Sequence, residues 1–404
     1  MTVSADDVAA AARTIAGQVV ATPLVPSAAL SEIAGTQLLL KLENLQHTGS
    51  FKARGALNKL SSLNPEVTHG IVACSAGNHA QGVAFFAARQ GFAATIVMPR
   101  GTPFTKVERT EAHGATVVLE GDTLAEAETF THALAQREGL VFVHPYDDPL
   151  IVAGQGTVGI EMLDAAPDLD AIVVPIGGGG LIAGIATAVK ARRPEIRVVG
   201  VEAALYPSMS EALGGRPATS GGTTLAEGIA VKNPGRLTQP ITEALVDEIV
   251  VLDEPAIESA VELLAEAAHL VVEGAGATAL GAVLARPELF AGRRTGLVIS
   301  GGNIDMRLLA TVLLRGMVRG GQMIRLRVQI ADAPGSLARV GRVIGDAGGN
   351  VVDIVHQRMF YNVPVKQADL DVVIETRNAA HGLAIRQALD AAGLPTRVLD
   401  DSDA

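Results

Sequence analysis

The sequence predicts an α/β protein in which helices cover a mainly parallel sheet and a small antiparallel domain follows. Three observations support this fold class. The chain has 404 residues, 48% hydrophobic and 19% charged, which is enough for two or three domains with a sizeable core. Short apolar runs alternate with helix-length stretches rich in Ala, Leu, Glu and Gln over the first 300 residues. Beyond residue 320 the pattern changes to strict alternation of apolar and polar residues.

Seven short apolar runs predict the strands of the parallel sheet, because strands buried on both faces lack polar alternation. They lie at 70–73, 93–98, 115–119, 140–143, 171–176, 198–201 and 296–299. Gly-rich turns follow three of them, at 75–78, 177–180 and 300–303. Ligands of open α/β sheets bind at the carboxyl ends of strands. Three such turns therefore predict one composite site.

The last 80 residues predict a domain of their own. Apolar residues at 324, 326, 328 and 330 form one face of a half-buried strand. A turn follows, with Ser336 as the expected N-cap of a helix that Gly348 and Gly349 end. Strands at 351–357 and 369–375, a helix at 379–392 and a strand at 396–399 complete a ferredoxin-like βαββαβ order. We expect a domain boundary between 1–320 and 321–404.

The composition excludes several classes of protein. A net charge of -11 disfavours a nucleic-acid binder, and an aromatic content of 3% without Trp disfavours a base-stacking surface. The single Cys excludes an intrachain disulfide and a multi-Cys metal site. No secretory pattern opens the sequence, and four consecutive glycines interrupt the apolar stretch 171–189. We expect a cytoplasmic protein that binds no metal, nucleic acid or membrane.

Lys52 is the first candidate for chemistry, in the segment SFKARGA. Ser50 is a candidate helix cap, which would put Lys52 in the first turn of a helix. The positive end of the helix dipole would lower the pKa of this lysine. A lowered pKa suits Schiff-base chemistry. Read alone, Lys52 could also be an ordinary surface lysine.

Three further segments follow predicted strands. In SAGNHAQG, Ser75 is a candidate cap, the loop amides can hold a carboxylate, and Asn78 offers a donor and an acceptor. The four glycines of GGGGL match neither a P-loop nor a dinucleotide fingerprint, so they indicate a single phosphate. In SGGN, the hydroxyl of Ser300 could bond a ring nitrogen. Read singly, each segment is also compatible with a simple turn.

Together the four segments resemble, in order and spacing, the β-family (fold type II) of pyridoxal-phosphate (PLP) enzymes. Within it they are most similar to the threonine ammonia-lyases, also called threonine dehydratases. The segments at 226–232 and 273–277 also resemble family segments. The turn at 332–337, Asp-x-Pro-Gly-Ser-Leu, resembles that of an ACT domain, a module that binds amino acids and regulates amino-acid enzymes.

The resemblance implies two open twisted α/β subdomains, the smaller at about 45–150 inserted in the larger, and pyridoxal 5'-phosphate as the cofactor. Lys52 would bind the cofactor covalently and act as the catalytic residue. The other implied cofactor contacts are Phe51, Asn78, Gly177, Gly178, Gly179, Gly180, Leu181 and Ser300. The implied contacts of the substrate carboxylate are Ser75, Ala76, Gly77, Asn78 and His79. Because Ser300 is neutral, the ring nitrogen of the cofactor need not be protonated. β-Elimination tolerates an unprotonated ring.

The implied function is α,β-elimination of water from L-threonine, which gives 2-oxobutanoate and ammonia, with side activity on L-serine. The family also implies a homo-oligomer, a dimer or a tetramer, in amino-acid metabolism such as isoleucine biosynthesis. Isoleucine or valine would act as an allosteric effector at the ACT domain. The sequence does not separate a biosynthetic from a catabolic role.

Four alternatives remain. L-serine dehydratase and serine racemase use the same scaffold. A racemase needs a second acid or base, which is a Ser at the position of Ala76. Its cation site needs, besides Glu202, an acidic residue at the position where this chain has Ser208. A cystathionine or cysteine synthase fits SAGNHAQG and AEGIAVK less well. A non-catalytic amino-acid sensor would need neither Lys52 nor the glycine loop.

Overall fold

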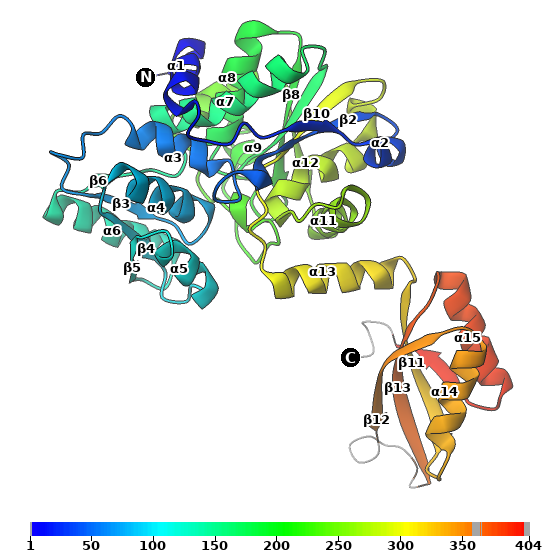
Figure 1. Ribbon diagram of the computed structural model, residues 1–404. Helices are drawn as coiled ribbons and strands as arrows, with labels where there is room; N and C mark the ends of the chain where they lie inside the picture. Colours follow the sequence, from blue (N-terminus) through cyan, green and yellow to red (C-terminus); the bar gives the residue numbers. More distant parts are fainter. Residues whose placement is uncertain (1, 358–363, 365, 400–404) are drawn as a thin grey trace. The chain divides into compact units, whose positions relative to one another are not determined.

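The computed structural model describes residues 2–357, 364 and 366–399. They belong to two compact units, 1–304 and 305–404 (Figure 1). The helix α13 (Met306–Arg319) is grouped with the second unit, and the boundary expected at residue 320 lies at its end. Within the described residues, none of the helices combines the length and apolar character that a bilayer crossing requires.

The larger sheet of the first unit has six strands in the order β1-β2-β10-β7-β8-β9. Their bounds are β1 (Leu24–Pro26), β2 (Gln37–Leu42), β10 (Arg294–Ile299), β7 (Ala171–Pro175), β8 (Arg197–Ala203) and β9 (Glu248–Leu252). All neighbours are parallel except β1 and β2. The predicted strands at 171–176, 198–201 and 296–299 are confirmed as β7, β8 and β10.

The smaller sheet has four parallel strands in the order β5-β4-β3-β6. They are β3 (Ile71–Cys74), β4 (Ala94–Met98), β5 (Thr116–Leu119) and β6 (Val141–Phe142), and all four were predicted to within two residues. The chain forms this sheet between β2 and β7 of the larger one. The helices α4, α5 and α6 pack around it (Figure 1).

Twelve helices belong to the first unit within the described residues. They are α1 (Ala5–Ile15), α2 (Ala28–Ala34), α3 (Lys52–Leu60), α4 (Asn78–Gln90), α5 (Phe104–Glu111), α6 (Leu124–Glu138), α7 (Pro149–Ala165), α8 (Gly180–Arg192), α9 (Ser208–Leu213), α10 (Thr238–Leu245), α11 (Glu254–Ala268) and α12 (Gly274–Ala285). Short 3-10 turns lie at η1 (Glu43–Leu45), η2 (Glu227–Ile229) and η3 (Pro287–Leu289). Asp148 caps α7 directly before Pro149, and Thr123 opens α6 with a capping box.

A buried ionic network fixes α3 to the larger sheet. Arg54 is fully buried, and its guanidinium contacts Glu43 at 2.8 Å and Glu161 at 2.6 Å. Lys41, on β2, joins the same network through Glu161 at 2.5 Å. Burial of a charge is costly unless it is paired and hydrogen-bonded, as these groups are. The network thus holds α3 against β2 and α7.

The second unit is a four-stranded antiparallel sheet in the order β12-β13-β11-β14. Its elements are β11 (Met323–Ala331), α14 (Ser336–Asp346), β12 (Asn350–Gln357), β13 (Gln367–Glu375), α15 (Ala379–Ala391) and β14 (Thr396–Val398), which confirms the ferredoxin-like order. One face of the sheet and the two helices form its core. The expected cap was wrong: Gly335, at φ 88°, takes the N-cap position, and Ser336 is the first helical residue.

We predict that Arg54→Met destabilises the first unit strongly, because it removes the ion-pair partner of the fully buried Glu43. Breaking a buried pair from one side costs about 3–5 kcal/mol. Thermal unfolding followed by circular dichroism measures the effect. Arg100→Met is the matched control, because Arg100 pairs with Glu120 at the exposed surface. Equal unfolding midpoints for the two variants would show that the buried network contributes no stability.

Candidate active site

Three of the four segments singled out in the sequence lie at the carboxyl ends of β3, β7 and β10, and the SFK segment lies at the start of α3. Ser50 forms an isolated antiparallel bridge with Gly301, and the Phe51 amide donates to the Ser300 carbonyl at 3.1 Å. These contacts join the SFK and SGGN segments directly. Asn303, in the turn at 300–303, donates to Asn78 at 2.7 Å, which brings two of the three predicted turns into contact.

Lys52 is the first residue of α3, as predicted, but Ser50 does not cap the helix. Phe51 occupies the N-cap position and makes no side-chain cap bond. Ser50 lies one residue too early, in the bridge to Gly301, and its buried Oγ has no partner among the described residues. The capping prediction failed because the bridge, and not the helix, determines the backbone position of Ser50.

The Lys52 amine is held by its neighbours. Its Nζ donates to the Pro145 carbonyl at 2.6 Å and lies 5.2 Å from the centroid of the Phe51 ring. Burial lowers the pKa of Lys52 to about 8, and the nearby charge of Glu273 opposes this in part. The expected lowering is therefore present, but burial and not the helix dipole is its leading cause.

The SAGN loop leads from β3 into α4. Gly77 is the N-cap, so the expectation for Ser75 is corrected: its Oγ instead accepts from the Gly77 amide at 3.2 Å. The amides of Asn78 and His79 have no acceptor among the described residues. A Cβ added at Gly77 would meet no atom within 4 Å, so there is open space beside the loop. Free amides facing free space can hold a carboxylate.

The side chain of His79 is part of the core and not of this loop. Its Nε2 lies 2.9 Å from the Val143 carbonyl, which makes Nε2 the protonated nitrogen of the neutral ring. Burial, and then the charge of Lys52, lower the pKa of His79 to about 3. A neutral imidazole held in this way leaves only the backbone of His79 to contact a ligand.

The glycine loop connects β7 to α8. No amide from Gly177 to Ile182 donates a hydrogen bond to the described part of the chain, so six N–H groups gather at the start of a 13-residue helix. Such a group of amides suits an anion. The glycines also allow close packing: a Cβ at Gly178 would overlap the Tyr146 ring, and one at Gly179 would lie 2.6 Å from Thr238 Oγ1.

The loop between β6 and α7 is a part of the site that sequence reasoning missed. The Pro145 carbonyl accepts from Lys52, and the Tyr146 ring covers the glycine loop. Asp147 accepts from the amides of Arg236 and Leu237 at 3.1 and 2.8 Å, at the chain that leads into α10. The Lys52 contact uses a backbone carbonyl, which leaves no signal in side-chain identity.

Glu273 is a further residue to which the sequence analysis assigned no role. It precedes α12, and its Oε1 accepts from Asn78 Nδ2 at 2.7 Å. Burial raises the pKa of Glu273 to about 7, although hydrogen bonds from Asn78 and Asn303 oppose this. The pKa values of Glu273 and Lys52 are thus both shifted toward neutral pH by burial.

Glu202 is a helix cap and not an isolated acid at a strand end. Its carboxylate accepts from the amides of Met209 and Ser210 at 2.7 and 2.9 Å, at the start of α9. Across the described residues, no group of three or more His, Cys, Asp or Glu side chains could hold a metal ion. Glu202 is thus committed to α9.

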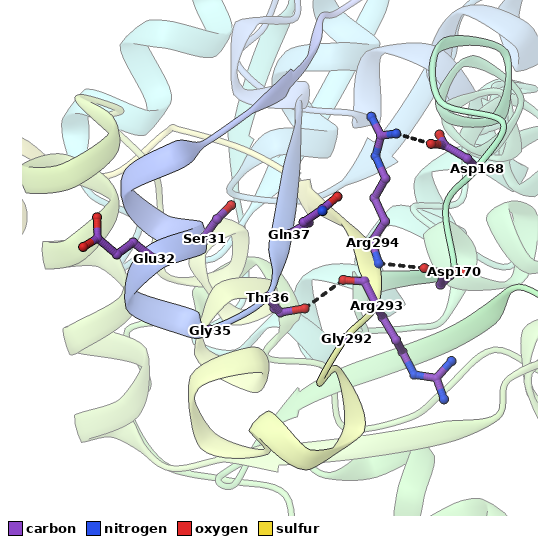
Figure 2. A pocket seen from close by; sticks show the side chains of 10 residues that line it. All are labelled: Ser31, Glu32, Gly35, Thr36, Gln37, Asp168, Asp170, Gly292, Arg293 and Arg294. Carbon is purple, nitrogen blue, oxygen red and sulfur yellow. Dashed lines mark hydrogen bonds and ion pairs between the residues drawn. The ribbon is translucent and has the colours of Figure 1, made fainter.

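A groove with a volume of about 640 Å³ lies at the opposite edge of the larger sheet. Figure 2 shows its lining at the amino ends of β2 and β10, where Arg294 pairs with Asp168 and donates its amide to Asp170. Thr36 donates to the Arg293 carbonyl at 2.8 Å. The main polar groups that line the groove thus bond one another. The groove lies at the amino ends of the strands, whereas Lys52 lies at the carboxyl ends.

Comparison with known proteins relates the whole chain to enzymes. The model of a family described as "Pyridoxal-phosphate dependent enzyme" matches residues 15–301. An L-threonine ammonia-lyase of Thermotoga maritima is 42% identical over 400 residues, covering 98% of this chain and 100% of the relative. A solved threonine deaminase from T.th. has a TM-score of 0.71 and 42% identity, covering 75% of this chain and 99% of that one. Maize serine racemase has a TM-score of 0.73 and 33% identity, covering 79% and 99%.

We predict that Lys52 is unusually reactive toward amine reagents in the cofactor-free protein. With a pKa of about 8, about a quarter of its amine is neutral at pH 7.5, against about one part in a thousand at the ordinary value of 10.5. Pulse labelling with acetic anhydride across pH, read by mass spectrometry, should give a midpoint near pH 8. Lys59, on the same helix and paired with Asp148, is the control. A Lys52 midpoint above pH 10 would contradict the burial argument.

Proposed function

Because this chain belongs to the family of pyridoxal-phosphate dependent enzymes, we propose that it is an L-threonine ammonia-lyase, which converts L-threonine into 2-oxobutanoate and ammonia. The observation that carries this proposal is the 42% identity to an L-threonine ammonia-lyase over nearly the whole of both chains. That match includes the second unit, which the family model does not cover.

The residues at the site fit pyridoxal 5'-phosphate. Lys52 is buried and basic at about pH 8, which suits covalent attachment of an aldehyde. The unpaired amides from Gly177 to Leu181 would hold the phosphate group. Asn78 would donate to the phenolic oxygen, Ser300 would bond the ring nitrogen, and Phe51 lies beside the Lys52 amine. The amides of the segment 75–79 would bind the substrate carboxylate.

The side chains can carry out an elimination. When bound, the cofactor withdraws electrons from Cα of the amino acid. The Lys52 amine, once free and neutral, takes the proton from Cα, and the β-hydroxyl then leaves. The Pro145 carbonyl holds that amine by an N–H, which leaves its lone pair available for the proton. The amides at the start of α4 hold the substrate carboxylate during this step.

A racemase is the principal alternative, because maize serine racemase shares the fold at 33% identity. Racemisation needs a second proton donor on the face of Cα opposite to Lys52. The methyl group of Ala76 cannot supply a proton at the position where the racemases carry a Ser. Elimination therefore agrees better with the residues present than racemisation does.

The second unit is proposed to bind an amino-acid effector, isoleucine or valine. A cavity of about 320 Å³ lies where β11 turns into α14. Its lining consists of Ile330, Ala331, Asp332, Ala333, Pro334, Gly335, Ser336, Leu337 and His356. The backbone at the start of α14 offers amides for a carboxylate, and Ile330 and Leu337 offer apolar surface.

Three further expectations belong to this proposal. The enzyme is expected to act in the cytoplasm, to assemble as a homo-oligomer such as a tetramer, and to serve isoleucine biosynthesis. The single, buried and free Cys74 agrees with a reducing compartment. A ferredoxin-like sheet with open edges is a common surface for pairing between copies.

We predict that the purified protein with bound cofactor releases 2-oxobutanoate from L-threonine, and pyruvate more slowly from L-serine. Lys52→Ala should lose at least about a thousandfold in kcat, because it removes both the attachment point and the base. Chromatography of the oxo acids, with chiral analysis of serine, measures this. A cofactor band without oxo-acid release would contradict the lyase, and accumulation of D-serine would favour the racemase.

We predict that isoleucine binds the full-length enzyme and changes its threonine kinetics. Ala333→Leu, which fills part of the cavity at 330–337, should weaken isoleucine binding about tenfold in calorimetry, because Ala333 lines the cavity. Ala338→Leu is the control, since Ala338 is exposed on the adjoining helix α14 and does not line the cavity. No heat with either isoleucine or valine, and unchanged kinetics, would contradict an effector site here.

A further inference from the structure

The side chain of Asn78 is enclosed by two residues for which the proposed function has no use. Asn303 Nδ2 donates to Asn78 Oδ1 at 2.7 Å, and Asn78 Nδ2 donates to Glu273 Oε1 at 2.7 Å. Asn78 begins α4, Asn303 follows β10, and Glu273 precedes α12. One short chain of hydrogen bonds therefore links the smaller sheet's first helix to two elements of the larger sheet.

The direction of this chain is fixed at one end by a backbone carbonyl. Asn303 Nδ2 also donates to the Thr48 carbonyl at 2.7 Å, and a carbonyl can only accept. The NH₂ group of Asn303, and not its oxygen, must therefore face Thr48 and Asn78. Asn78 in turn must present its oxygen to Asn303, which turns its own NH₂ group toward Glu273.

This assignment leaves one hydrogen of Asn78 without a partner. The NH₂ group carries two hydrogens, and Glu273 takes one of them. Within the described residues, the second has no acceptor. The rotated amide would place its oxygen against the Glu273 carboxylate, where two acceptors repel. Asn303 thus determines that Asn78 offers a donor, and not an acceptor, to a bound ligand.

Three glycines from separate segments make room for the same arrangement. A Cβ at Gly49, which has φ +69°, would lie 2.8 Å from Asn303 Oδ1. A Cβ at Gly301 would lie 2.5 Å from Glu273 Oε1, and one at Gly228 would lie 3.1 Å from it. The close approach of Glu273 therefore explains why Gly301 of SGGN and Gly228 of the segment 226–232 are glycines. Distances this short leave little space for any side chain larger than hydrogen.

We propose that Asn303 is a positioning residue, which fixes the amide of Asn78 so that one N–H is available to the phenolic oxygen of the cofactor. Glu273 completes the arrangement as the acceptor on the other side. The inference rests on the proposed cofactor contact of Asn78, but not on the identity of the amino-acid substrate. Asn303 acts through Asn78 and touches neither substrate nor cofactor in this scheme.

A double-mutant cycle on the absorbance spectrum of the bound cofactor tests the inference. A hydrogen bond to the phenolic oxygen alters the relative heights of the cofactor's absorbance bands, which a purely structural role would not change. Asn303→Ala should change the spectrum in the direction of Asn78→Ala and weaken pyridoxal 5'-phosphate binding about tenfold, as expected for one hydrogen bond. In the Asn78→Ala background, Asn303→Ala should change neither quantity further.

Asn44→Ala is the matched control. Asn44 also donates to a backbone carbonyl in this region, that of Val271 at 3.2 Å, but it does not contact Asn78. Its variant should retain the wild-type spectrum. If Asn303→Ala does not fold, as judged by circular dichroism, the isosteric Asn303→Asp, which also lacks the donor, takes its place in the cycle.

The outcomes separate this inference from the proposed function. A wild-type spectrum in the Asn303 variant, additive effects in the cycle, or an equal change in Asn44→Ala would each overturn the inference. A wild-type protein that binds the cofactor but leaves threonine unchanged would overturn the proposed reaction alone. A wild-type protein that binds no pyridoxal 5'-phosphate would overturn both.

Discussion

The pairing of the chain before α3 with the chain after β10 is the constraint on which the site depends. The Phe51 amide donates to the Ser300 carbonyl at 3.1 Å, and the Gly302 amide donates to the Gly49 carbonyl at 2.9 Å. These two bonds join segments about 250 residues apart, and they continue the long-range pairing of β2 with β10. They fix where α3 begins and hence where the Lys52 amine lies. The Arg54 network fixes the other side of the same helix.

Burial then sets the chemistry of the groups that this pairing brings together. The low dielectric of the site disfavours both the Lys52 ammonium and the Glu273 carboxylate. It lowers the pKa of the first to about 8 and raises that of the second to about 7. The negative charge of Glu273 limits the lowering at Lys52, because it stabilises the ammonium. Burial thus moves the pKa values of both groups toward neutral pH.

The sequence predicted the elements whose pattern is local and missed those that depend on distant partners. The smaller sheet was predicted completely because its strands are plain apolar runs. The strand β2 was missed because Lys41 interrupts its pattern, and the charge of the buried Lys41 is paired by Glu161, 120 residues away. The cap assigned to Ser50 failed for the same reason, since Gly301 determines its position. Backbone contacts such as that of Pro145 leave no trace in residue identity.

The order of the chain also connects the site to the second unit. Asn303 lies three residues before Met306, the first residue of α13, and Asp305 caps that helix with bonds of 3.0 and 3.1 Å to the amides of Arg307 and Leu308. The covalent path from the residue that orients Asn78 to the first turn of α13 is therefore only three residues long. Coupling between two binding sites is reciprocal. If an amino acid bound near Gly335 changes the affinity of the enzyme for threonine, then threonine changes the affinity for that amino acid by the same factor. If such an effect exists, α13 is the helix that lies between the two sites in the chain.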